Sequence, residues 1–161
     1  MCLWFVKGRL ARSKKEDEKM TNKIIIRKAT IKDIKAVREI ANVPGLKAAG
    51  DDEAPPARWY SPLIKKMFYI AEVDGEVVGF LTGENLRNIG LLWEIGVFPK
   101  FRSQGIGSIL LKKFIDECNK KKLVVMIAYG SNNENTLGFF RKHKFIEGGT
   151  YKELRLNLKN F

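Results

Sequence analysis

The sequence predicts a single mixed α/β domain whose sheet is mostly antiparallel. One observation is the dipeptide Asp74-Gly75 between two strand-like runs, which indicates a two-residue β-hairpin. A second is the passage from a strand at 91–97 through a helical pattern at 105–120 to a strand at 123–129. Such a crossover returns the chain in the same direction and makes one parallel strand pair. The length of 161 residues suits one domain with its own core.

Seven strands and four helices are expected along the chain. The strands are runs rich in β-branched and apolar residues, at 24–27, 68–73, 76–84, 91–97, 123–129, 145–151 and 153–158. The helices are expected at 30–41, 61–66, 105–120 and 134–142. Thr30 is the expected N-cap of the first helix, whose apolar stripe is formed by Ile34, Val37, Ile40 and Ala41. The near-continuous apolar run at 123–129 is typical of a strand that is covered on both faces.

We expect residues 1–22 to be a flexible N-terminal extension and residues 23–161 to form the domain. The extension begins with a short apolar run, 1–6, and a strongly charged stretch follows it, which is the wrong order for a secretory signal. A membrane-touching anchor is the alternative interpretation of the apolar run. The sequence contains no apolar run of the roughly 20 residues that cross a bilayer. We therefore expect no membrane partner.

Composition narrows the chemistry. Two cysteines, Cys2 and Cys118, make no disulfide framework, so a reducing, cytoplasmic setting is expected. Because His143 is the only histidine, we expect no metal site. The net charge of +12 attracts polyanions, which include nucleic acids, anionic lipids and phosphate-rich cofactors. The basic residues are spread along the chain without a recognised nucleic-acid motif, so nucleic acid is not the expected partner.

The segment from Arg102 to Gly107 has the chemistry of an anion site. It lies where a strand has ended and a helix begins, and helix N-termini expose unpaired N–H groups and a positive dipole end. Gly105 and Gly107 carry no side chain that would keep a phosphate away, and Arg102 adds a permanent cation. The pattern is neither GxxxxGK[ST] nor a complete GxGxxG. A pyrophosphate is the expected ligand, and a glycine turn that only starts a helix is the alternative.

The stretch at 97–107, VFPKFRSQGIG, resembles the coenzyme-A-binding signature V-x-P-x-x-[RQ]-x-x-G-x-[GA] of the GNAT N-acetyltransferase superfamily. Segments 26–33, 70–80 and 133–145 resemble the opening strand and helix, the second hairpin and the late motif of the same family, and the resemblance extends over 24–158. It implies a single GNAT-type α/β domain with a splayed central parallel strand pair. It also implies an N-acetyltransferase that uses acetyl-CoA as its cosubstrate.

The resemblance implies which residues hold acetyl-CoA. Backbone groups of Ile95, Gly96 and Val97 would bind the pantetheine arm, which would lie in the splay like an extra strand. Beside Arg102, the pyrophosphate would be held by backbone N–H groups of Ser103, Gln104, Gly105, Ile106, Gly107 and Ser108. Asn133 would contact the pantetheine or keep the splay open, and it could also serve as a helix cap.

The late motif departs from the family pattern at Thr136, Lys144 and Phe140. Phe140 stands in the cofactor site where the family usually has a Tyr, whose hydroxyl is credited with protonating the departing thiolate. Tyr129 and Tyr151 are candidates to replace that hydroxyl, although a Tyr at the end of a strand is more often a packing residue. Direct release is the alternative, because an alkyl thiol has a pKa of about 8.5.

Glu94 is the candidate general base, because it is a charged residue inside an otherwise apolar strand beside the cofactor motif. Strand alternation places its side chain opposite to that of Val97 unless a bulge intervenes. A solvated or ion-paired glutamate is the alternative interpretation, and Glu72 is a second candidate for the base. A backbone N–H near Val97 would meet the oxyanion that develops during transfer.

The acceptor is expected to be an amine-bearing small molecule or protein. The loop at 44–62 carries the acidic residues Asp51, Asp52 and Glu53, and Trp59 and Tyr60 follow, so a cationic amine is favoured. A solvated loop without a partner is the alternative. Two other functions stay open: a CoA-binding regulatory module without turnover and a basic nucleic-acid-binding domain. The sequence leaves both a monomer and a homodimer open.

Overall fold

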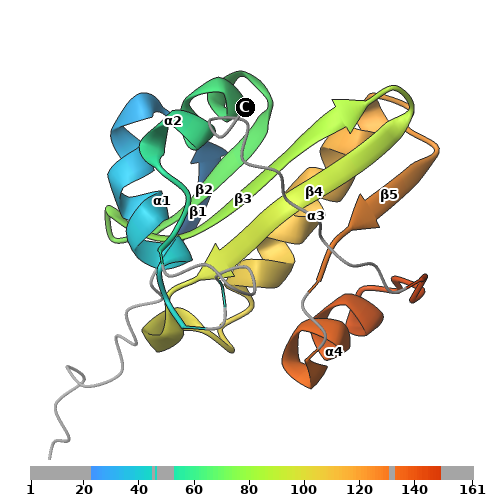
Figure 1. Cartoon of the computed structure of the whole chain (residues 1–161). Coiled ribbons are helices and arrows are strands. Elements are labelled where there is room, and N and C mark those ends of the chain that lie inside the picture. The colour runs from blue at the N-terminus through green and yellow to red at the C-terminus, as the bar shows by residue number, and fades with distance from the viewer. Residues whose placement is uncertain (1–22, 45, 47–52, 131–132, 150–161) are drawn as a thin grey trace, which may run out of the picture.

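A five-stranded mixed sheet forms the centre of the computed structural model, which describes residues 23–44, 46, 53–130 and 133–149 (Figure 1). The strands lie in chain order: β1 (Ile24–Lys28), β2 (Met67–Val73), β3 (Glu76–Leu86), β4 (Ile89–Val97) and β5 (Val125–Ala128). The first four pair antiparallel, and β5 pairs parallel to β4. The predicted mixed α/β domain with one parallel strand pair is therefore confirmed.

Helices cover the two faces of the sheet (Figure 1). On one face lie the 3-10 turn η1 (Ile31–Asp33), α1 (Ile34–Ala41), the short α2 (Ala57–Tyr60) and the 3-10 helix η2 (Ser61–Lys65). On the other face lies α3 (Ile106–Lys120), which follows the 3-10 turn η3 (Pro99–Phe101), and α4 (Glu134–Lys142) lies beyond β5. Four α-helices are thus present in the described part of the chain. Within that part, no helix is long and apolar enough to cross a membrane.

The apolar stripes of the helices fill two cores. Val37 and Ile40 of α1 are buried with Phe68, Ile70 and Phe80 of the sheet. On the opposite face, α3 buries a row of apolar side chains against β2, β3 and β4: Ile106, Leu110, Leu111, Phe114 and Cys118. The predicted stripe of the first helix, Ile34, Val37, Ile40 and Ala41, is buried in full. The period of 3.6 residues was therefore a correct guide to the core faces.

Local turn chemistry places the hairpin and the first helix as expected. Asp74 and Gly75 have φ angles of 52° and 80°, the left-handed pair that a two-residue hairpin requires. Thr30 is the N-cap residue of η1, and its N–H donates to Asp33 Oδ2 at 2.7 Å. Arg27 of β1 also binds Asp33, through two hydrogen bonds of 2.8 and 2.7 Å, and Glu72 of β2 at 2.6 Å. This ion cluster fixes the start of the helical layer to the sheet.

Two sequence expectations are wrong for the described residues. The prediction of about seven strands fails, because the described sheet has five, and residues 145–149 pair with no neighbour in it. An extended segment becomes a strand only when a partner takes its backbone hydrogen bonds. The remainder of that segment, with Tyr151 and the strand expected at 153–158, lies outside the described residues, as does the extension at 1–22.

The expectation that the run at 123–129 is covered on both faces is also wrong in the described structure. Met126 and Ala128 pack on the α3 core, but Val125 and Ile127 point to the other side and are exposed. The cause is position, since β5 lies at one end of the described sheet, whereas α1 packs over β3 and β4. An apolar run records hydrophobicity and not which neighbours will cover it.

Candidate active site

The turn at 102–107 forms the N-terminal entrance to α3. Ser103 and Gly105 have φ angles of 62° and 81°, and Gly105 is the N-cap of the helix. A Cβ atom added at Gly105 would meet nothing within 4 Å, so the space above this turn is open. The first intrahelical bond runs from Ile109 N–H to Gly105 O at 3.0 Å, and the N–H groups before Ile109 precede the helical ladder. The entrance therefore presents backbone donors to open space, as an anion site requires.

Side chains of the turn hold it against the end of β4. Arg102 Nε donates to the carbonyl of Val97 at 3.1 Å, and Gln104 Nε2 donates to the carbonyl of Lys100 at 3.3 Å. Ile106 is buried in the α3 core and anchors the first turn of the helix. The guanidinium that the sequence suggested as a phosphate ligand thus lies at the junction of the strand and the helix. Its bond to Val97 also fixes the strand end relative to the turn.

The helix α4 closes the other side of this entrance. Ser108 Oγ and His143 Nε2 are 2.9 Å apart, and the ring of Phe139 lies 3.4 Å from the position of a Cβ on Gly107. Asn133 is the N-cap of α4, where its Oδ1 accepts the N–H of Thr136 at 2.9 Å, so its capping role is confirmed. Sequence reasoning missed the contact of His143, because nothing in the chain order brings position 143 to position 108.

Phe140 lies among apolar groups near the end of β5. Its ring packs edge-on against Phe139 and Phe145, with centroids 5.3 and 5.0 Å apart, and it lies close to Gly130. Tyr129 directly follows β5, and 59% of its surface is exposed. Phe140 also packs on the α3 core, together with Met126 and Ala128 of β5.

The parallel strands β4 and β5 separate halfway along β4. Pairing begins at Ile89 with Val125 and ends at Leu92 with Ala128, whereas β4 continues to Val97 (Figure 1). On its other edge this last part of β4 stays paired with β3, where Ile95 lies opposite Leu81 and Val97 opposite Gly79. The backbone of Ile95, Gly96 and Val97 therefore has one edge facing β3 and one edge facing the gap. A splay of this kind is what an extended ligand arm needs to join β4 as a strand would.

A β-bulge in β4 decides where Glu94 points. Gly83 pairs with Leu92 and Thr82 pairs with Glu94, so Trp93 is an extra residue on β4. Before the bulge, Leu92 belongs to the α3 core. After the bulge, Gly96 faces α1, since a Cβ there would lie 3.2 Å from Ile40. Because strand faces alternate, Glu94 shares the α1 face with Gly96 and points away from Val97, as the alternation had indicated.

Glu94 receives a hydrogen bond from a buried tyrosine. Tyr60 OH donates to Glu94 Oε2 at 3.0 Å. The ring of Tyr60 is fixed by Phe68 and Phe80, whose centroids lie 6.2 and 6.4 Å away. Burial raises the pKa of the Glu94 carboxyl, and the hydrogen bond from Tyr60 offsets part of that rise. Burial and the neighbouring carboxylate both raise the pKa of Tyr60, which keeps its hydroxyl a proton donor.

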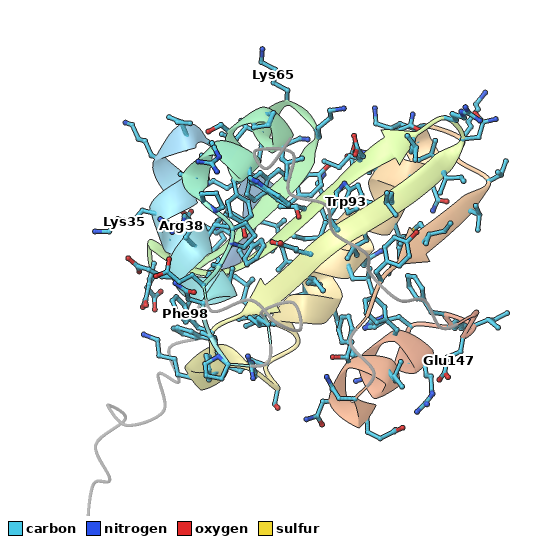
Figure 2. All side chains as sticks on the ribbon, in the orientation of Figure 1. Lys35, Arg38, Lys65, Trp93, Phe98 and Glu147 are labelled. Atoms are coloured by element: carbon cyan, nitrogen blue, oxygen red, sulfur yellow. The ribbon has the colours of Figure 1, made fainter. Side chains whose placement is uncertain are left out.

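The carboxylate of Glu94 lines a cavity of about 280 Å³ between the α2–η2 segment and strands β3 and β4. The lining residues are Pro55, Trp59, Tyr60, Leu63, Thr82, Glu84, Trp93 and Glu94. Trp93 is labelled on β4 in Figure 2. A carboxyl with a raised pKa in a partly apolar cavity is suited to accept a proton near neutral pH.

The loop at 44–62 supplies aromatic residues of the cavity but not Glu53. Trp59 and Tyr60 line the cavity, as the cationic-acceptor hypothesis requires. Glu53 is exposed and does not line it, and Asp51 and Asp52 lie outside the described residues. Glu72, the second candidate for the base, is bound to Arg27 in the ion cluster and does not line the cavity. Sequence reasoning missed Glu84, Thr82 and Trp93, whose convergence depends on the register of β3 and β4.

The family follows from a direct comparison. A model of the acetyltransferase (GNAT) family matches residues 34–145, which include the cavity, the turn and α4. The chain belongs to this family. An uncharacterised N-acetyltransferase of Methanocaldococcus jannaschii is 31% identical over 103 residues, which make up 56% of this chain and 46% of the relative. The chain thus spans less than half the length of that relative.

Solved structures agree on the fold. Ard1 from Thermoplasma volcanium has a TM-score of 0.66 and 25% identity, over 78% of this chain and 84% of that one. The PaiA N-acetyltransferase from Thermoplasma acidophilum, solved in complex with coenzyme A, has a TM-score of 0.59 and 20% identity, over 76% of this chain and 87% of that one. The described residues fit a coenzyme A ligand in two places, the open turn at Gly105 and the gap beside Val97. No group of acidic, His and Cys side chains suited to a metal occurs among them.

Proposed function

We propose that this GNAT domain, residues 23–161, transfers an acetyl group from acetyl-CoA to a primary amine that binds in the Glu94 cavity. The observation that carries the proposal is the position of Glu94 beside Ile95 on β4. Its side chain lines the cavity on one face, and the next residues border the gap toward β5. The proposed base and the proposed binding site for the pantetheine arm therefore lie next to each other on β4.

The residues of the turn and the gap have separate tasks in this proposal. Backbone N–H groups from Ser103 to Ser108, with Arg102 beside them, bind the pyrophosphate, because the helix entrance is open there. Backbone groups of Ile95, Gly96 and Val97 bind the pantetheine arm on the edge of β4 that β5 leaves. Asn133 and Phe140 flank the arm from the α4 side. The thioester carbonyl would then lie next to the cavity that holds the amine.

Glu94 takes the proton that the acceptor ammonium must lose before its nitrogen can attack. The nitrogen then bonds to the thioester carbonyl carbon, the carbon–sulfur bond breaks, and the sulfur leaves with the electron pair, while the second proton of the nitrogen passes to solvent. The thiolate either leaves directly or takes a proton from Tyr129, since Phe140 has no hydroxyl. A Tyr129→Phe variant separates the two routes, because an unchanged kcat selects direct release.

Acetyl-CoA binding provides the first test. A ligand that binds only the folded state adds RT ln(1 + [L]/Kd) to the free energy of unfolding, so millimolar acetyl-CoA should raise the melting temperature by several degrees. Gly107→Val should weaken this shift, because the added side chain enters the space between the turn and Phe139. Gly138→Val is the matched control, since a Cβ at Gly138 in α4 meets nothing within 4 Å.

Turnover provides the second test. Thiol release from acetyl-CoA is measured with a panel of primary amines, including small cationic amines and basic peptides. A melting-temperature shift without thiol release from any amine would favour a CoA-binding regulatory module, the second function that Phe140 supports. The absence of any shift with acetyl-CoA would contradict both functions.

A further inference from the structure

The Glu94 cavity contains a second carboxylate that the proposed reaction does not use. The indole N–H of Trp93 donates a hydrogen bond to Glu84 Oε1 at 3.0 Å, and the Lys66 ammonium donates one to Glu84 Oε2 at 2.9 Å. The hydrogen bond from Lys66 is the main cause that lowers the pKa of Glu84, so this carboxylate is ionised at neutral pH. Glu84 therefore already holds an alkylammonium group, one of the chain itself, at the wall of the cavity.

The two carboxylates lie on the same face of paired strands. Thr82 pairs with Glu94, and Glu84 follows Thr82 by two residues on β3, so Glu84 and Glu94 are diagonal neighbours. The Cα atoms of diagonal neighbours in an antiparallel pair lie roughly 7–8 Å apart. That spacing suits two ammonium groups joined by a short chain of methylene groups.

Within the described residues, a buried hydroxyl without a hydrogen-bond partner lies opposite Glu94 and two residues before Glu84. Thr82 is fully buried, and its hydroxyl oxygen makes no hydrogen bond in the described structure. Buried hydroxyls without a partner are uncommon in folded proteins and often mark a place that a ligand or a water occupies. Thr82 lines the same cavity, directly opposite Glu94. The unmet hydrogen bond is independent of the two charges, and it leaves a polar group at the wall of the cavity that a ligand or a water could satisfy.

The walls of the cavity suit an alkyl chain with cationic ends. Trp59 and Trp93 both line it, and 65% and 44% of their surfaces are exposed. Exposed indole rings are the aromatic groups that attract ammonium ions best. The hydrogen bond to Glu84 also fixes the orientation of the Trp93 ring. Two indoles, two carboxylates and one hydroxyl donor–acceptor therefore converge on one small cavity.

We propose that the acceptor is an α,ω-diamine or a longer polyamine, with its reacting amine at Glu94 and its second ammonium at Glu84 in place of Lys66. This inference rests on the proposed function. Displacement of Lys66 is favoured by its flexible, half-exposed side chain, because exposed ion pairs contribute little to stability. In the alternative, the Lys66–Glu84 pair only joins the end of η2 to β3, and the cavity makes no distinction between amines.

The test compares putrescine with the amino alcohol of the same chain length, in which a hydroxyl replaces the second amine. Wild-type kcat/KM should favour putrescine by about tenfold or more, as expected for a lost hydrogen bond between charged groups. Glu84→Gln should bring that ratio close to equality, and Lys66→Met should increase it, because the competing ammonium is gone. Glu76→Gln is the matched control, since Glu76 forms a similar but exposed pair with Lys100 outside the cavity.

Equilibrium binding of putrescine, measured by calorimetry, separates this inference from the proposed function. If no amine is acetylated but putrescine binds and Glu84→Gln abolishes the binding, the diamine site stands and the proposed function fails. If amines are acetylated and the amino alcohol is used as well as putrescine, the diamine inference is overturned. A ratio that Glu84→Gln and Lys66→Met both leave unchanged would also overturn it, provided that each variant keeps a cooperative thermal transition.

Discussion

Two carboxylates on the α1 face of the sheet differ in their partners. Asp33 is bound by the guanidinium of Arg27, and that hydrogen-bonded pair lowers the pKa of its carboxyl to about 2. Glu94 forms no ion pair within the described residues, and its hydrogen-bond partner there is the neutral hydroxyl of Tyr60. Burial therefore dominates and raises the pKa of Glu94. The comparison separates a carboxylate that stabilises the fold from one whose burial favours proton transfer.

The largest expected effect is on catalysis, when Glu94 is replaced. Glu94→Gln should lower kcat/KM by about 10²–10⁴-fold, because a positioned general base contributes that much. Its free energy of unfolding at pH 7 should stay equal or rise slightly. Because the folded-state pKa of Glu94 is raised, the folded protein becomes less stable as the pH rises through that pKa. A glutamine does not ionise, so it removes this loss of stability. Steady-state kinetics and urea unfolding measure the two quantities.

Glu117→Gln is the control for that prediction, because Glu117 lies on α3 and pairs with Lys113 and Lys120 away from the cavity. If Glu94→Gln retains full activity with every accepted amine, Glu94 is a strand glutamate without a catalytic role. In that case its raised pKa reflects burial alone.

An intermediate effect is expected on the side of Asp33. Asp33→Asn should lower the free energy of unfolding at pH 7 by about 2–3 kcal/mol, because it leaves Arg27 without its main partner. The folded-state pKa of about 2 lies below the unfolded value of about 3.9. The stabilisation is therefore present above about pH 4 and is lost as the pH falls toward 2. Urea unfolding of both proteins at several pH values measures this convergence.

The exposed pair between Lys112 and Asp116 supplies the control, since Asp116→Asn should change stability by less than about 0.5 kcal/mol. If Asp33→Asn proved equally mild, the ion cluster would be a surface feature and the contrast with Glu94 would disappear.

The smallest effect is a shift of a pH profile. Tyr60→Phe removes the hydrogen bond that lowers the pKa of Glu94, so that pKa should rise further. The acid limb of kcat/KM against pH, at saturating acetyl-CoA, should therefore move to higher pH. Tyr69→Phe is the matched control, because Tyr69 is equally buried on the α3 face and its hydroxyl has no hydrogen-bond partner among the described residues. A limb that stays in place in Tyr60→Phe would mean that another group titrates.

Much of the fold could be predicted because its signals are local. The hairpin at Asp74 and Gly75 needed only two residues that accept positive φ, and both have it. The stripe of α1 followed from helical spacing, and the glycine turn before α3 followed from residue type and order. The failures involve neighbours. The run at 145–149 found no strand to pair with in the described sheet, and β5 has one face exposed.

The candidate site divides in the same way. The segment 97–107 determined the open turn before α3 by itself, because a strand end, two glycines and a helix start are consecutive in the chain. The face on which Glu94 lies was decided by the bulge at Trp93, which depends on how β4 aligns with β3. The register of β3 and β4 brings Thr82 and Glu84 into the cavity of Glu94, and the bond from Tyr60 to Glu94 exists only after α2 docks on the sheet. Sequence order sets backbone conformation locally, whereas register and docking decide which distant side chains share a cavity.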